Sequence, residues 1–247
     1  MQVADMKRCG GRSGRGFGVL FLSTLAGILA PLIFLVIMTA VGFLQPGYDA
    51  VQEAISKLVL GLYGWFQTVS FFVVGSLLIV FALGLYIATL GKTATKVGFI
   101  FLLLSGIGFL ALGAFPVVPD GAAFTAPGVV HSAAVGVVST SFVLGSSAFS
   151  VHFRGDREWS KFWLYTVVTA IACAVFALLW TATPERWLWK GLSERLLAVT
   201  GFAWVEIVSL RLLRLCLRRR AEAGVTQPNL SSAVITCNND LHRRQIE

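Results

Sequence analysis

Long runs of apolar residues separated by short polar stretches dominate the pattern of this chain. A helix needs about 20 such residues to cross a hydrocarbon layer of about 30 Å. Six runs reach that length, with expected limits at residues 17–44, 58–90, 97–118, 129–151, 162–182 and 192–213. None shows the strict alternation of a membrane β-barrel. The pattern therefore predicts an all-α integral membrane bundle of six transmembrane helices.

Two tails flank this predicted membrane domain of residues 17–213. Residues 1–16 carry four basic side chains among glycines, which indicates a flexible basic arm. The apolar run after it is about twice as long as the core of a signal peptide, so we expect a retained helix, with a kink at Pro31. Residues 214–247 begin basic and continue without a pattern that could pack, and we expect most of this tail to be disordered.

Composition agrees with a membrane environment and argues against nucleic acid as a partner. The chain is 56% hydrophobic and 13% charged, with a mean hydropathy of +0.79. Its net charge of +8 comes from basic residues in tails and short loops beside the apolar runs. Membrane lipids are therefore the expected partners, in a multi-pass protein of the cell membrane.

The basic residues also predict the orientation. Sixteen of the 20 Lys and Arg residues lie in the N-terminal tail, the turn near residues 91–96, the loop near 152–161 and the C-terminal region from Arg211 onward. The connections on the opposite side hold Lys57, Arg186, Lys190 and Arg195. The positive-inside rule then places both termini in the cytoplasm and the link between residues 118 and 129 outside.

Polar residues gather near the expected starts of the second, fourth and sixth helices, all on the outer side. A helix start carries unpaired N–H groups and a partial positive charge, so an outward polar pocket for a small molecule or a lipid headgroup is one hypothesis. The alternative is that these residues form no pocket and instead cap helices, pair along a helix or face water. The candidate pocket residues are Tyr48, Ser56, Asp120, His131, Glu194 and Arg195.

Three of these residues would be the candidates for catalysis. A carboxylate such as Asp120 can orient the imidazole of His131 for proton transfer, and Ser56 is a conceivable nucleophile. Paired histidine spacings and a G-x-S-x-G context are missing from the sequence, so no metal and no cofactor are expected. The alternative of a metal-dependent or Ser/His hydrolase of lipids stays open beside a function without catalysis.

Two residues within the last apolar run and its basic edge carry further hypotheses. Glu206 falls well inside the run, where a carboxylate is costly unless it is neutral, paired or facing water. A proton-coupled transporter using Glu206 is therefore a second alternative, and a packing residue held by Gln67 or Arg211 is its rival. Cys216 lies among leucines and arginines at the membrane edge, where it is a candidate for acylation.

Several short motifs resemble the domain-of-unknown-function 998 family. They are Tyr48-Asp49 with Ile55-Ser56-Lys57-Leu58, Phe115-Pro116 with Asp120 and His131, and Gly191 to Arg195 with Trp204. The resemblance covers roughly residues 17–213 and implies a six-helix membrane protein without an assigned reaction. A fainter resemblance to alkaline-ceramidase-like membrane hydrolases implies a site of Ser, Asp and His around zinc.

Overall fold

The computed structural model describes residues 3–89, 92–119, 123, 125–182 and 189–225. Within these residues the chain is helical, and no strand is present. Six long helices are α1 (Val3–Leu44), α2 (Gly64–Ala88), α3 (Thr93–Ala114), α4 (Ala126–Arg154), α5 (Trp163–Ala182) and α6 (Lys190–Val225), with 3₁₀ helices η1 (Ile55–Leu60) and η2 (Ser160–Phe162). All six long helices contain an apolar stretch long enough to span a membrane, so the all-α bundle of six transmembrane helices is confirmed.

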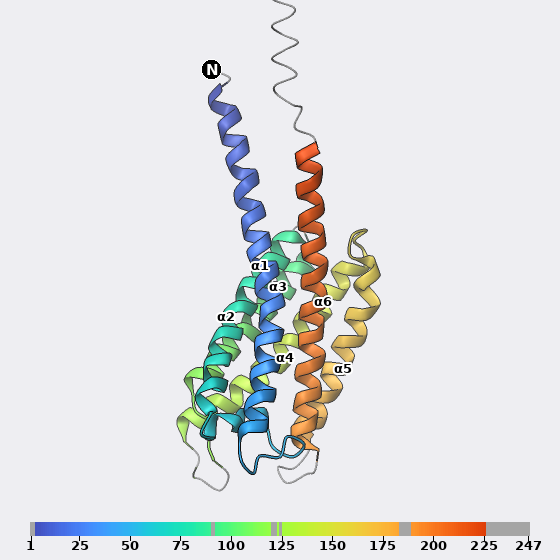
Figure 1. Ribbon diagram of the computed structural model, residues 1–247. Coiled ribbons are helices and arrows are strands. Elements are labelled where there is room, and N and C mark those ends of the chain that lie inside the picture. The colour runs from blue at the N-terminus through green and yellow to red at the C-terminus, as the bar shows by residue number, and fades with distance from the viewer. Residues whose placement is uncertain (1–2, 90–91, 120–122, 124, 183–188, 226–247) are drawn as a thin grey trace, which may run out of the picture.

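The helices form a closed ring in the order of the sequence. Each helix packs against its neighbours along the chain, and α6 returns to pack against α1. α1, α3 and α5 end where α2, α4 and α6 begin, and we call this the connector end. At the opposite, terminal end, α1 and α6 rise beyond the other four helices, as Figure 1 shows.

Aromatic side chains fill the interior of the ring. Phe34 of α1 lies with its ring centroid 4.8 Å from that of Phe202 of α6 and 5.7 Å from that of Phe109 of α3. Nearer the terminal end, the fully buried Trp204 packs edge-on against Phe142 at 5.6 Å and donates its indole N–H to the hydroxyl of Thr166 at 3.0 Å. Aromatic pairs of this geometry stabilise a core beyond the apolar area that they bury.

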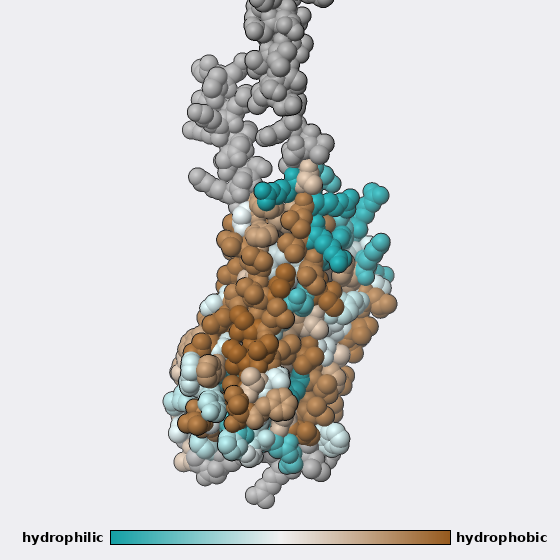
Figure 2. Space-filling view, viewed as in Figure 1, coloured by the Kyte–Doolittle hydropathy of each residue, from teal (hydrophilic) through white to brown (hydrophobic). Residues whose placement is uncertain are grey.

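The outer surface is apolar, as contact with lipid requires. Large side chains such as Leu22, Val36, Leu164 and Leu178 are more than half exposed. Figure 2 shows the brown, hydrophobic belt over the bundle, with hydrophilic residues gathered at the terminal end. An exposed apolar belt of this extent has no place on a soluble protein. Its natural solvent is the hydrocarbon of a bilayer.

Several helix limits differ from those read from hydrophobicity. α2 begins at Gly64 instead of about Leu58, because Ile55–Leu60 form a 3₁₀ helix after an irregular turn. α1 runs from Val3 to Leu44 with Pro31 inside it, so the basic arm expected to be flexible is the start of a helix. α6 continues to Val225, so the first part of the tail expected to be disordered is helical. Hydrophobicity locates the membrane segment of a helix and carries no signal for where the helix itself ends.

Helices α1 and α2 approach closely at Gly84, which predicts a packing defect on substitution. A Cβ added at Gly84 would overlap the Cβ of Ser23, and Ser23 is buried. We expect Gly84→Ala to lower the stability of the detergent-solubilised protein by about 1–3 kcal/mol, as overpacking does. Gly136→Ala is the matched control, since nothing lies within 4 Å of its added Cβ. Equal thermal unfolding midpoints for the two variants would contradict this packing.

Candidate functional site

Arg195 fastens the connector between α1 and α2 to the start of α6. Its guanidinium donates to the carbonyl of Glu53 at 2.9 Å, to the carbonyl of Gly191 at 3.0 Å and to the hydroxyl of Tyr48. The Tyr48 hydroxyl in turn donates to the carbonyls of Glu53 and Ala54, at 3.2 and 3.0 Å. The planar fork of arginine suits this arrangement, because it reaches acceptors from two segments at once.

Backbone contacts complete this connector clasp, which we define as Tyr48, Val51–Ile55 and Gly191–Arg195. The N–H of Leu192 donates to the carbonyl of Val51 at 2.8 Å, and the N–H of Ile55 donates to the carboxylate of Glu194 at 2.7 Å. A Cβ at Gly191 would overlap the carbonyl oxygen of Glu53, so only glycine permits this approach. The clasp therefore depends on the glycine, the glutamate and the arginine of the short segment Gly191–Arg195.

The environment of Tyr48 keeps its hydroxyl protonated. Burial raises the pKa of Tyr48 to about 12, against the opposing effect of the neighbouring Arg195 cation. A neutral hydroxyl can accept from Arg195 and still donate to the connector carbonyls, which a phenolate cannot do. The clasp thus needs the protonated form of the residue.

A cavity of about 100 Å³ lies inside the ring and reaches the clasp. Most of its wall is apolar, with phenyl rings from α1, α2, α3, α4 and α6. The polar lining residues are Ser56, Ser105, Ser139 and Glu194. Glu194 is the one lining side chain with an ionisable group among the described residues of this wall. Its carboxylate therefore belongs both to the clasp and to the cavity.

The six pocket residues expected from sequence divide into three groups. Ser56 and Glu194 line the cavity. Tyr48 and Arg195 belong to the clasp, where their polar groups already bind the connector. His131 is buried in α4, with Nδ1 on the carbonyl of Phe115 at 2.8 Å and Nε2 without a hydrogen-bond partner among the described residues. Asp120 lies outside the described residues.

Glu206 of α6 finds none of the partners proposed for it among the described residues. Its Oε2 is buried without a hydrogen bond, and both side-chain amide atoms of Gln67 are likewise unpaired there. Arg211 instead donates to the carbonyl and the carboxylate of Glu158, at 2.6 and 3.0 Å. Glu206 thus stays a hypothesis for a proton or cation site. Cys216 is buried, and its acylation also stays a hypothesis.

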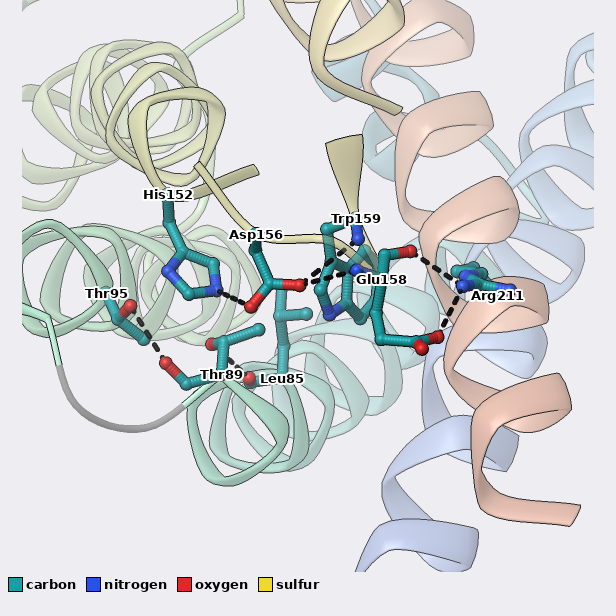
Figure 3. A network of polar contacts seen from close by, with 8 residues as sticks. All are labelled: Leu85, Thr89, Thr95, His152, Asp156, Glu158, Trp159 and Arg211. Atoms are coloured by element: carbon teal, nitrogen blue, oxygen red, sulfur yellow. Dashed lines mark hydrogen bonds and ion pairs between the residues drawn. The ribbon is translucent and has the colours of Figure 1, made fainter. Parts of the chain in front are cut away.

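A second polar cluster lies at the terminal end, shown in Figure 3. Asp156 accepts from the backbone N–H groups of Glu158 and Trp159, at 2.9 and 3.3 Å, and its other oxygen lies 3.7 Å from Nε2 of His152. Together with the Arg211 bonds, these contacts attach the loop between α4 and α5 to α6 (Figure 3). We interpret this cluster as a structural tie between helix ends.

Neither cluster assembles the ligand set of a metal centre. Within the described part of the chain, no three His, Cys, Asp or Glu side chains are grouped to hold one ion. Sequence reasoning also missed the cavity wall, in particular Phe34, Phe109 and Ser139. Each sits in a run that is apolar on all sides, so its sequence context does not separate the ring interior from the lipid face.

The ring of six spanning helices around an internal cavity defines a multi-pass α-helical membrane protein. The family model described as "Protein of unknown function (DUF998)" matches residues 28–211, and the chain belongs to this family. Comparison with curated proteins and with solved structures finds no match. The resemblance to alkaline ceramidases therefore gains no support.

The clasp predicts a strong difference between two chemically identical substitutions. Arg195→Lys keeps the charge but loses the fork that reaches Glu53, Gly191 and Tyr48, so we expect a loss of about 1–3 kcal/mol of stability. Arg214→Lys, at an exposed position of the same helix, should change stability by less than about 0.5 kcal/mol. Thermal unfolding in detergent measures both. Indistinguishable variants would contradict the role of Arg195 in the clasp.

The raised pKa of Tyr48 predicts a pH dependence with a definite sign. An unperturbed tyrosine titrates near about pH 10, and burial raises the pKa of Tyr48 to about 12 in the folded protein. As pH rises from about 10 to about 12, the unfolded chain loses this proton first, so the stabilising contribution of Tyr48 is lost. The stability advantage of wild type over Tyr48→Phe should therefore shrink across this range. A constant difference between the two midpoints would contradict it.

Proposed function

We propose that this protein binds a small, mainly apolar molecule in the cavity of the ring, with the polar end of the molecule at Ser56 and Glu194. The supporting observation is the composition of the wall, which is apolar throughout except for three serines and one carboxylate. Small-molecule sites typically combine an apolar wall with a few placed polar groups. The function is that of a ligand-binding membrane protein without catalysis.

The size of the cavity sets the scale of the ligand. Its volume of about 100 Å³ compares with the roughly 150 Å³ of an engineered apolar cavity that binds benzene or xenon. A ring of five or six atoms, or the end of a longer chain, matches this scale. Phe34, Phe109 and Phe202 offer flat faces and edges to such a molecule. A whole lipid headgroup with its phosphate does not match.

The expected orientation would place the polar end of the cavity on the extracytoplasmic side of the cell membrane. The basic side chains at the terminal end support this orientation. They include Lys92 and Lys96 at the start of α3, Arg154 at the end of α4 with Arg157 in the loop after it, and Arg218–Arg220 on α6. Ser56 and Glu194 lie at the connector end, far along the helices from this basic edge. The positive-inside rule assigns the basic edge to the cytoplasm.

No contact among the described residues favours the hydrolase or the transporter over binding alone. Ser56 and His131 share no hydrogen bond there, and Nδ1 of His131 is held by the Phe115 carbonyl. A nucleophile and its base need hydrogen-bond reach of one another. Glu206 is not among the residues that line the cavity. Binding is therefore the function that the geometry supports best.

Filling the cavity tests this proposal. Ser139→Leu adds bulk at a buried position of the wall, whereas Thr140→Leu adds the same bulk at the next, exposed position of α4. Solvent extraction and mass spectrometry of purified protein should find a small molecule in wild type and in Thr140→Leu. Ser139→Leu should lose at least about nine-tenths of it, because the leucine occupies the same space. The same extract from all three proteins would refute the proposal.

A further inference from the structure

Ser105 and Ser139, two of the serines that line the cavity, already donate their hydroxyl protons to backbone carbonyls. The hydroxyl of Ser105 donates to the carbonyl of Val138 at 3.3 Å. The hydroxyl of Ser139 donates within α4, to the carbonyls of Val135 and Gly136 at 3.0 and 3.2 Å. A hydroxyl that donates its single proton keeps two lone pairs. These two side chains therefore present hydrogen-bond acceptors to the space between them.

The connector end of the cavity is also rich in acceptors. Glu194 accepts from Ile55 through one oxygen, and in its ionised form the carboxylate has about four lone-pair sites in all and no donor. The neighbouring Arg195 directs its N–H groups at Glu53, Gly191 and Tyr48 in the clasp. Ser56 is the lining hydroxyl that makes no hydrogen bond within the described part of the chain. Its proton remains free to donate, so apart from Ser56 the polar lining residues present acceptors while Glu194 is ionised.

We infer that the bound molecule carries a hydrogen-bond donor, a hydroxyl or an N–H group, on an otherwise apolar body, and that this donor binds Glu194. The inference rests on the proposed function and specifies the ligand class of the same cavity. A ligand acceptor placed against a buried acceptor of the wall leaves both groups without a hydrogen bond. Binding then loses the free energy of desolvating both groups. Opposite the ionised Glu194, ketones, esters and anionic heads are therefore disfavoured, while an alcohol can donate to Glu194 and also accept from Ser56.

Three five-membered rings of similar size probe this class. Pyrrole donates through its N–H, cyclopentanone only accepts, and furan is nearly isosteric with pyrrole but has no donor. The measured quantity is the dissociation constant from the concentration dependence of the unfolding temperature in detergent. Ser139→Leu supplies the background of partition into the micelle. On wild type we expect pyrrole to bind about tenfold more tightly than cyclopentanone, and more tightly than furan.

Glu194→Gln should reverse this preference. The amide oxygen can still accept from the N–H of Ile55, which keeps the clasp bond and turns the NH₂ group toward the cavity. The ratio of the pyrrole and cyclopentanone dissociation constants should then change by about tenfold in favour of cyclopentanone. Comparing this ratio between two proteins cancels the different hydration of the two probes. Thr140→Leu, outside the cavity, should keep the wild-type ratio.

The outcomes separate this inference from the proposed function. A preference for pyrrole on wild type that reverses in Glu194→Gln supports both. If all three rings bind wild type equally, the donor requirement is overturned and cavity binding stands. If no ring binds wild type above the Ser139→Leu background, the proposed function fails as well. Should Glu194→Gln not fold, the pyrrole and furan constants on wild type alone decide, because equal values overturn the inference.

Discussion

Inside a bilayer every backbone N–H and C=O must find its partner within the protein, and this constraint shapes the whole molecule. Helices meet it along their length and fail to meet it at their ends. Ring closure between α1 and α6 lets six helices bury one another, but it leaves the connector between α1 and α2 to be satisfied by other means. Arg195, Tyr48 and Glu194 provide those means, since they bind the connector backbone directly.

The clasp links the helix ends to the interior. Glu194 accepts the Ile55 N–H as a structural bond, and the same side chain lines the cavity. Its neighbour Arg195 donates to the carbonyls of Glu53 and Gly191 instead. Of these two consecutive residues of α6, Arg195 therefore supplies donors to the clasp and Glu194 supplies acceptors to the cavity. Positions next to each other on a helix point in different directions, which allows this separation.

The sequence predicts the fold well and the site only in part. Six apolar runs suffice for the number and class of helices, because length and hydropathy alone decide whether a helix can span. The polar residues near the connector end were recognisable, yet their roles were not. The polar groups of Tyr48 and Arg195 form hydrogen bonds within the clasp. The backbone carbonyls that accept these bonds are identified only by the structure. Phe34, Phe109 and Ser139 gave no signal, since lipid and ring interior select the same apolar side chains.

The polarity of the cavity follows from how membrane helices accommodate serine. A hydroxyl in an apolar environment satisfies its proton on a nearby carbonyl, as Ser139 does on its own helix and Ser105 does on α4. Each such bond removes a donor from the interior and leaves lone pairs exposed there. The carboxylate of Glu194 adds acceptors without adding a donor when it is ionised. The packing requirements of the helices therefore give the cavity its chemical preference, even though neither serine was placed by contact with a ligand.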